Sequence, residues 1–329
     1  VLAQYQARLE AQGHSMVCYE TQTTDPAELL RRTGDSDIAI LANTPYPASV
    51  VEGASQLKLL NVAFTGVDHV ALEACRAKGV TVCNAAGYST QCVAELALGL
   101  TIACLRQLPA CETAARSGGA GTPFRGREIA GRTVGIVGTG AIGTRTAQLF
   151  QAFGARVIAY SRTRRPEVER LGVTYVSLEE LLQQSDIVSL HVPSNGETKG
   201  LLSRQRLAMM KPSAILINVA RGAIVDNVAL AEALNQGQLA GAGIDVFDQE
   251  PPLAPRQERG AHPPCGLRHR GEYAPPGGDR LPQYRCFFGG KARECVPVSE
   301  GTPVRIQQRP VLRVECPEDW ALHFVVYGP

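Results

Sequence analysis

The sequence lacks three features that would place it in other classes of protein. No apolar run approaches the roughly 20 residues that span a bilayer. The formal net charge is only +2, from 33 basic and 31 acidic residues, which is too small to indicate a nucleic acid or a membrane surface as partner. The ten cysteines include no C-x-x-C pair. We therefore expect reduced thiols in or near the core, no metal site, and a cytoplasmic protein.

The most informative stretch that is present is the glycine-rich segment 131–143. Thr133–Val137 is an apolar, β-branched run typical of a strand, and residues 142–153 have helical spacing. Gly138, Gly140 and Gly143 between them have G-x-G-x-x-G spacing. Such a turn lets backbone approach a pyrophosphate at the helix N-terminus. A tight turn without a ligand is the alternative, but the flanking strand and helix favour dinucleotide binding.

The rest of the chain divides into segments of different character. Residues 1–90 predict a small α/β domain, with strands at 15–19, 37–42, 57–63 and 80–83 and helices at 2–12, 26–32 and 67–78. Because these residues begin on a helix, we expect a preceding strand to be missing. A long connecting helix is predicted over 91–115, since the stretch has few helix breakers. From 116 to 252 strands and helices alternate, which indicates βαβ units around a parallel sheet. The predicted strands of this segment are 133–137, 156–160, 174–176, 187–191, 214–218 and 240–245, and the helices are 142–153, 178–184, 204–210 and 227–236.

Residues 253–329 differ from everything before them. Most of the 21 prolines lie beyond Glu250, and residues 254–310 show no sustained period of 2.0 or 3.6. A disordered tail is one interpretation. A shifted reading frame is the other, and the nucleotide sequence around the codon of Pro252 would separate the two.

Several motifs up to Pro252 resemble those of the D-isomer-specific 2-hydroxyacid dehydrogenases. They are TGVDHV at 65–70, STQCVAELALGL at 89–100, the glycine motif, HVPSNGETKGLL at 191–202, INVARGAIVD at 217–226 and LAGAGIDVFDQEPP at 239–252. The resemblance implies an α/β fold with a Rossmann-type doubly wound parallel sheet in 116–252. It also implies that 1–90 form a smaller, flavodoxin-like substrate domain. In the family a returning C-terminus completes that domain, and because the segment after Pro252 does not match the family, we expect the domain to be incomplete here.

The resemblance assigns catalytic roles to Arg221 and Glu250. Arg221 follows the predicted strand 214–218, and ligands bind at the carboxyl ends of parallel strands. Its planar guanidinium suits a carboxylate, and the resemblance implies that it binds and polarises a 2-keto acid. Glu250 would raise the pKa of a catalytic histidine. The expected T-P-H context for that histidine is absent, and His262 and His269 stand in other contexts. The alternatives are an ordinary surface arginine that caps the next segment and a solvated loop glutamate before two prolines.

The resemblance also assigns residues to substrate and cofactor. Backbone N–H groups of Thr65, Gly66 and Val67 would bind the substrate carboxylate. Asp245 would contact the nicotinamide amide, and Pro193 and Thr198 would lie near adenine and ribose. The remaining cofactor positions are Ala141 and Ile142 in the glycine motif, Ser161, Arg162 and Thr163 after the second strand, and Val219 and Ala220 before Arg221.

Cofactor preference follows from the residues after the strand 156–160. An acidic side chain there would accept a hydrogen bond from the ribose 2′-hydroxyl of NAD. The sequence instead has Ser161, Arg162, Thr163, Arg164 and Arg165, which favours the 2′-phosphate of NADP(H). A solvated basic loop that still accepts NAD(H) is the alternative.

The predicted function is NAD(P)-dependent reduction of a small 2-keto acid, such as glyoxylate or hydroxypyruvate, to the D-2-hydroxy acid, or the reverse reaction. Turnover is expected to be weak or absent without the histidine. The second hypothesis is a nucleotide-binding interaction module without catalysis. By analogy with the family we expect a homodimer, with the helix 91–115 as a contact.

Overall fold

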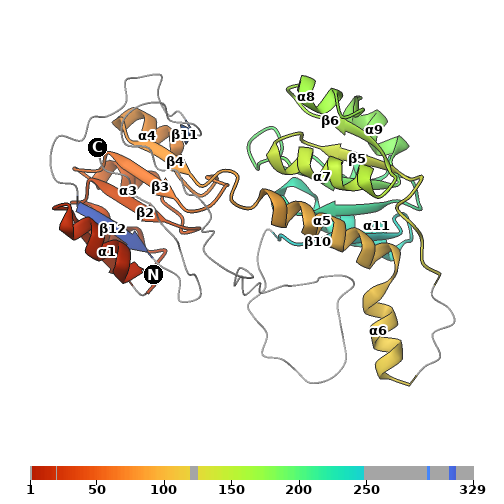
Figure 1. The fold of residues 1–329 in the computed structure, drawn as a ribbon, viewed down its shortest axis with the longest axis horizontal. Helices are drawn as coiled ribbons and strands as arrows, with labels where there is room; N and C mark the ends of the chain where they lie inside the picture. Colours follow the sequence, from red (N-terminus) through yellow and green to blue (C-terminus); the bar gives the residue numbers. More distant parts are fainter. Residues whose placement is uncertain (1, 20, 119–124, 248–294, 297–310, 316–329) are drawn as a thin grey trace. The chain divides into compact units, whose positions relative to one another are not determined.

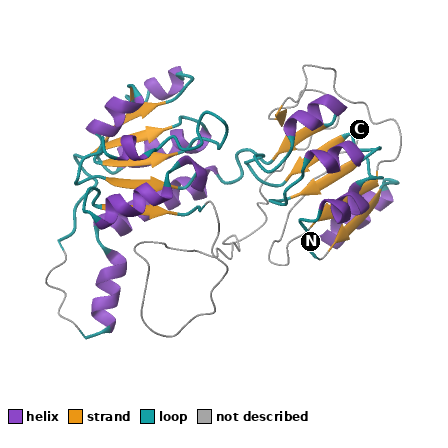
Figure 2. Cartoon of the chain, turned by 180° about the vertical axis from the view of Figure 1, so that it is seen from behind, coloured by secondary structure: helices purple, strands orange, loops and turns teal. Residues whose placement is uncertain are grey.

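The computed structural model describes residues 2–19, 21–118, 125–247, 295–296 and 311–315. They form two compact units, one made by residues up to Tyr88 with the two short C-terminal segments, the other beginning at Ser89. Each unit is a sheet of mainly parallel strands with helices against it (Figure 1; Figure 2). The predicted α/β class is confirmed.

The first unit has a sheet whose strands come in the order β1-β12-β2-β3-β4-β11. β1 (Ser15–Tyr19), β2 (Ile38–Leu41), β3 (Leu59–Val62) and β4 (Thr81–Asn84) were expected from the sequence. Its helices are α1 (Leu2–Ala11), α2 (Pro26–Thr33), α3 (Ala48–Gly53) and α4 (Leu72–Lys78). The expected helix 67–78 begins only at Leu72, because Val70 forms a bridge with Tyr46.

The core of this unit lies between the sheet and its helices. Leu60, Val62 and Val82 of the central strands are fully buried against α3 and α4 side chains, among them Val50 and Cys75. α2 begins where the Asp25 side chain accepts hydrogen bonds from the N–H groups of Ala27 and Glu28, with Pro26 in the first turn.

Two short strands from residues 253–329 join this sheet, in a segment for which no strand was predicted. β12 (Val311–Glu315) lies between β1 and β2 and is parallel to both, and β11 (Cys295–Val296) pairs antiparallel with β4. β1 and β2 are consecutive in sequence yet leave one strand position open between them, and residues 311–315 pair along both. Residues 311–315 include the charged Arg313 and Glu315, so they lack the continuous apolar run that predicted β5, and this strand was not predicted.

The second unit has a six-stranded sheet in the order β10-β9-β8-β5-β6-β7, with every neighbouring pair parallel. The strands are β5 (Thr133–Val137), β6 (Arg156–Tyr160), β7 (Thr174–Tyr175), β8 (Ile187–Leu190), β9 (Ile215–Asn218) and β10 (Gly241–Ile244). The order reverses direction at β5, as in a doubly wound Rossmann sheet. The Rossmann prediction is thus confirmed.

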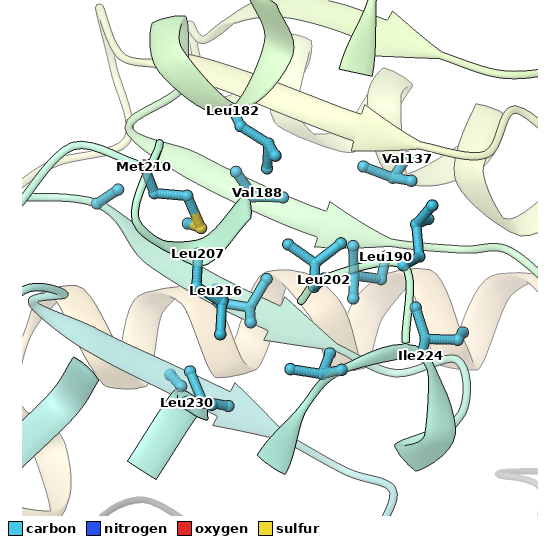
Figure 3. Packing of buried hydrophobic residues seen from close by; sticks show 14 of the residues in the cluster. Val137, Leu182, Val188, Leu190, Leu202, Leu207, Met210, Leu216, Ile224 and Leu230 are labelled. Carbon is cyan, nitrogen blue, oxygen red and sulfur yellow. The ribbon is translucent and has the colours of Figure 1, made fainter. Parts of the chain in front are cut away.

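Helices cover both faces of this sheet, so successive strand residues are buried on opposite sides. α5 (Thr90–Leu105) and α7 (Ala141–Ala152) pack on one face, and α9 (Leu178–Gln184), α10 (Arg204–Leu207) and α11 (Asn227–Asn235) belong to the other. In β9, Ile215 and Ile217 belong to the core cluster on the face of α5 and α7, which we call the first cluster. Leu216 belongs to the second cluster, on the opposite face. Figure 3 shows residues of the second cluster, among them Leu182, Leu190 and Leu216. Each such side chain contributes about 1.5–3 kcal/mol by leaving water. α8 (Pro166–Glu169) and the 3₁₀ turn Gly222–Ile224 complete the unit.

The predicted single helix over 91–115 is wrong. It divides into α5 and α6 (Leu108–Arg116), which meet at an angle of 57°. Gln107 between them has a positive φ of 51°, a backbone conformation that no helix interior tolerates. Within the described ranges, no single helix is long and apolar enough to cross a membrane, although α5 and α6 taken together pass a test of length and composition.

Candidate functional site

The glycine turn joins β5 to α7, and each of its three glycines has a separate structural reason. Gly138 has a φ of +97°, and a Cβ there would lie 2.7 Å from the carbonyl oxygen of His191. A Cβ on Gly143 would lie 1.9 Å from the Gly138 carbonyl oxygen, so the helix packs directly against the turn. Around Gly140, by contrast, a Cβ would meet no described atom within 4 Å.

This cradle fits a pyrophosphate. The space in front of Gly140 lets backbone approach a ligand, and the first N–H groups of α7, those of Ala141 and Ile142 among them, have no partner within the helix by its geometry. The helix dipole adds a partial positive charge at this end. Two backbone hydrogen bonds hold the turn in place. The Gly138 N–H donates to the Tyr160 carbonyl at 2.7 Å, and the His191 N–H donates to the Val137 carbonyl at 2.7 Å.

A basic loop follows β6 next to the turn. Ser161, Arg162 and Thr163 lie here with Arg164 and Arg165. Arg162 pairs with Glu197, with 2.5 Å between Nη1 and Oε2. The guanidinium carbon of Arg164 lies 5.9 Å from the centre of the Tyr175 ring.

Tyr175 connects this loop to the glycine turn. Its hydroxyl donates to Oγ1 of Thr139 at 2.8 Å and accepts from the Arg165 N–H at 3.2 Å. Thr139 is the buried residue between the first two glycines of the motif. Tyr175 was not identified from the sequence, where it is an unremarkable residue of a short strand.

The loop after β8 is ordered by its own side chains. Thr198 Oγ1 donates to the Pro193 carbonyl at 2.5 Å and accepts from the Asn195 N–H at 2.9 Å. Asn195 Oδ1 in turn accepts from the N–H groups of Glu197 and Thr198, at 2.9 and 3.2 Å. Pro193 and Thr198, predicted to lie near adenine and ribose, therefore belong to one compact turn.

His191, at the start of that loop, has an enclosed imidazole. Its Nε2 lies 2.9 Å from Ser189 Oγ, and its buried Nδ1 has no partner among the described residues. Burial lowers the pKa of His191 to about 3, because the charged form would lose its hydration without gaining a counter-ion. The imidazole is therefore neutral at physiological pH.

Arg221 lies just beyond β9, and a buried asparagine sets the backbone there. Asn218 Oδ1 accepts from the Ala220 N–H at 3.1 Å, and Asn218 Nδ2 donates to the Arg221 carbonyl at 2.9 Å. Val219 and Ala220 are buried between them. Asp245, at the end of β10, donates its N–H to the Asn218 carbonyl at 3.0 Å. Asn218 was missed, although a polar residue that ends a fully apolar strand was the available signal.

The first unit places the predicted substrate loop at the carboxyl end of β3. Asn84, at the end of β4, donates its side-chain N–H to the Thr65 carbonyl at 2.7 Å. Nearby, Phe64 and Tyr88 stack edge to face with 6.3 Å between ring centres. Gly66 and Val67 follow in an irregular, half-buried segment.

The structure thus gathers most predicted cofactor residues at one edge of the second sheet. Five adjacent parallel strands, β10, β9, β8, β5 and β6, end there with Asp245, Arg221, the Pro193–Thr198 turn, the glycine turn and the basic loop. Glu250, His262 and His269 lie outside the described residues. In the part of the chain that is described, no group of three or more His, Cys, Asp or Glu side chains is arranged to hold a metal ion.

Comparison with known proteins shows which family contains the segment that forms this edge. Residues 98–263 match the model of the D-isomer specific 2-hydroxyacid dehydrogenase NAD-binding domain. A glyoxylate reductase from Thermococcus litoralis is 39% identical over 233 residues, which cover 68% of this chain and 70% of that protein. The chain spans 44% of the length of a D-3-phosphoglycerate dehydrogenase from Methanocaldococcus jannaschii.

Two solved structures have the same fold. A D-lactate dehydrogenase from Aquifex aeolicus, complexed with NAD and lactic acid, is 32% identical with a TM-score of 0.64 and 67% of each chain covered. An acyclic imino acid reductase in complex with NADPH and D-Arg is 33% identical with a TM-score of 0.65, covering 69% of this chain and 73% of its own. The resemblance drawn from the motifs is confirmed, and the chain belongs to the D-isomer specific 2-hydroxyacid dehydrogenase family.

Proposed function

We propose that this protein reduces a small 2-keto acid, such as glyoxylate or hydroxypyruvate, to the D-2-hydroxy acid with NAD(P)H, or catalyses the reverse reaction. The observation that carries the proposal is the edge of the second sheet, where Asp245 and Arg221 follow the neighbouring strands β10 and β9 and the glycine turn follows β5. Ligands of doubly wound sheets bind outside the carboxyl ends of the strands, where the strand order reverses.

Arg221 is the residue we assign to the substrate. Its backbone is held by Asn218, and its guanidinium is held by the hydrogen bond that Nη1 donates to the Ala220 carbonyl at 2.8 Å. There it would bind the carboxylate with two parallel hydrogen bonds and polarise the neighbouring carbonyl. The nicotinamide supplies the hydride when bound. For the N–H groups of Thr65, Gly66 and Val67, binding of a substrate carboxylate stays a prediction from the family resemblance.

The step that protonates the new alkoxide is where this chain departs from its family. We assign Glu250 as the carboxylate that would hydrogen-bond the proton-donating histidine, but no histidine stands in the T-P-H context. General acid catalysis is worth about 10²- to 10⁴-fold, so we expect weak turnover. An assay with glyoxylate and NADPH tests this. Full activity would mean that another group protonates the alkoxide, and nucleotide binding without turnover would support the loss of the acid.

We propose NADPH rather than NADH as the preferred cofactor. Ser161 stands where an acidic residue would repel a 2′-phosphate, and Arg162, Arg164 and Arg165 follow it. A phosphate would gain charge-assisted hydrogen bonds from these guanidinium groups. The ratio of the Michaelis constants for the two nucleotides measures the preference, and a clear preference for NADH would contradict it.

A second candidate function is a non-catalytic, nucleotide-dependent interaction protein, which the missing T-P-H motif favours. The two candidates differ in a measurable way. A regulatory protein would copurify with a partner whose binding depends on NADPH, and a weak enzyme would not.

We also propose that the protein is a cytoplasmic homodimer that uses the α5–α6 region as a contact. Leu108, the first residue of α6, is 49% exposed, and α6 stands away from the helices that cover the sheet (Figure 1). Light scattering on the purified protein, with Leu108→Glu as the disrupting variant, tests the assembly.

A further inference from the structure

The ion pair between Arg162 and Glu197 joins two loops that are far apart in sequence. Arg162 follows β6 and Glu197 follows β8, and these are the two strands that flank β5 in the sheet. Since the glycine turn follows β5, the pair reaches across the strand end at which the turn lies. The two charged side chains are 70% and 68% exposed, so the pair is accessible to a ligand.

Both partners of the pair stand on loops that the structure holds in place. Glu197 sits in the turn fixed by Asn195 and Thr198, where its own N–H donates to Asn195 Oδ1 at 2.9 Å. On the other side, the backbone of Arg165 is bonded to the Tyr175 hydroxyl, which is bonded to Thr139 of the glycine turn. Holding two exposed side chains in one geometry costs conformational entropy, which offsets much of the stabilisation of an ion pair. Loops that are already ordered reduce this entropy cost.

We propose that Glu197 is a specificity-determining residue, which occupies the guanidinium of Arg162 and thereby limits how strongly the site prefers a phosphorylated ribose. The inference rests on the proposed NAD(P)-dependent function. A 2′-phosphate carries about −1.5 to −2 charges near neutral pH and must replace the Glu197 carboxylate on Arg162. A 2′-hydroxyl is uncharged and leaves the pair intact. Glu197 therefore weakens NADPH binding and has a smaller effect on NADH.

The substitution Glu197→Gln tests this because it removes the charge and keeps the size of the side chain. We expect the dissociation constants of NADPH and of 2′,5′-ADP to fall by about two- to fivefold, the range set by exposed ion pairs, and those of NADH and 5′-AMP to change less. Calorimetry at low salt measures all four, and the difference should shrink above about 0.5 M salt, where surface charges are screened.

Two further variants make the test specific. Glu232→Gln removes the carboxylate of another exposed pair, with Arg204, and should leave the NADPH to NADH ratio unchanged. In an Arg162→Gln background, Glu197→Gln should no longer improve NADPH binding. Weaker NADPH binding by Glu197→Gln, or an equal change for both nucleotides, would overturn the inference while leaving the proposed function intact. A wild-type chain that binds neither nucleotide would overturn both.

Discussion

The two sheets of this protein reach similar parallel arrangements from differently distributed sequence. The second sheet takes its six strands from one continuous stretch between Thr133 and Ile244. The first sheet takes a strand inside its order from residues 311–315, nearly 300 residues away from β1. Local motifs therefore predict the second sheet, whereas the first depends on the pairing of β12 with β1 and β2, which no local pattern predicts. The motifs of a sequence can therefore indicate the binding site of the second sheet, but they do not show which distant segment supplies a strand to the first.

The largest effect should come from breaking β12. Val314→Pro removes a backbone donor from a strand that is paired on both sides and leaves the acceptor of that hydrogen bond without a partner, which should cost the first unit about 1–3 kcal/mol. Hydrogen exchange should then accelerate in β1 and β2 and stay slow in β5 and β8, with nucleotide binding retained. Unchanged protection of β1 and β2 would contradict the pairing of β12.

The next effect should come from Arg221, which tests whether the chemistry belongs to the second unit. Arg221→Lys keeps the charge and loses the planar pair of donors, so kcat/KM for the keto acid should fall by about 10- to 100-fold, as expected for hydrogen bonds to charged groups. Steady-state kinetics measures it, with Arg206→Lys on α10 as the control. An unchanged kcat/KM would remove Arg221 from the site.

A smaller effect separates folding from binding within the glycine turn. Gly143→Ala places a Cβ 1.9 Å from the Gly138 carbonyl oxygen, and overpacking of this kind costs about 1–3 kcal/mol. Gly140→Ala meets open space and should leave the melting temperature unchanged, while it weakens NADPH binding by obstructing the phosphate. Equal melting temperatures for the two variants would contradict the packing described for Gly143.

The effect that is smallest at neutral pH is that of His191, which develops only as the pH falls. Its pKa is about 3 in the folded protein, against an ordinary value of 6.5. Below pH 6.5 the His191 imidazole therefore binds a proton in the unfolded chain but not in the folded chain. This contribution to stability is complete above pH 6.5 and is lost as the pH falls toward 3, at up to about 1.4 kcal/mol per pH unit. Denaturation of the second unit between pH 7 and 4 measures the slope, which His191→Gln should reduce.

The sequence predicted the second unit well because its signals are local. β5 and β6 have the predicted bounds, since each is a short apolar, β-branched run between turn residues. α9 also begins and ends as predicted, where Ser177 and Glu180 form a capping box. The first unit was less predictable. α3 was missed because it has only six residues, and the break at Gln107 depends on a backbone conformation that its side chain does not reveal.

The candidate site divides in the same way. Residues that directly follow strands, such as Gly138, Arg221 and Asp245, were placed from motifs. The residues that support them were not, because Asn218, Tyr175 and Glu197 act through contacts between segments. Tyr175 meets Thr139 across 36 positions and Glu197 meets Arg162 across 35. Such partners have no fixed spacing that a single sequence could display.

The place of β12 in the first sheet has a consequence for synthesis on the ribosome. Every strand of the second sheet has been translated by Ile244, so that sheet can close while the chain is still growing. β1 and β2 must wait with unsatisfied backbone edges until residue 315 emerges. At ordinary rates of translation this delay lasts seconds, and during it the early strands of the first unit are the part of the nascent chain most open to chaperones and to wrong pairing.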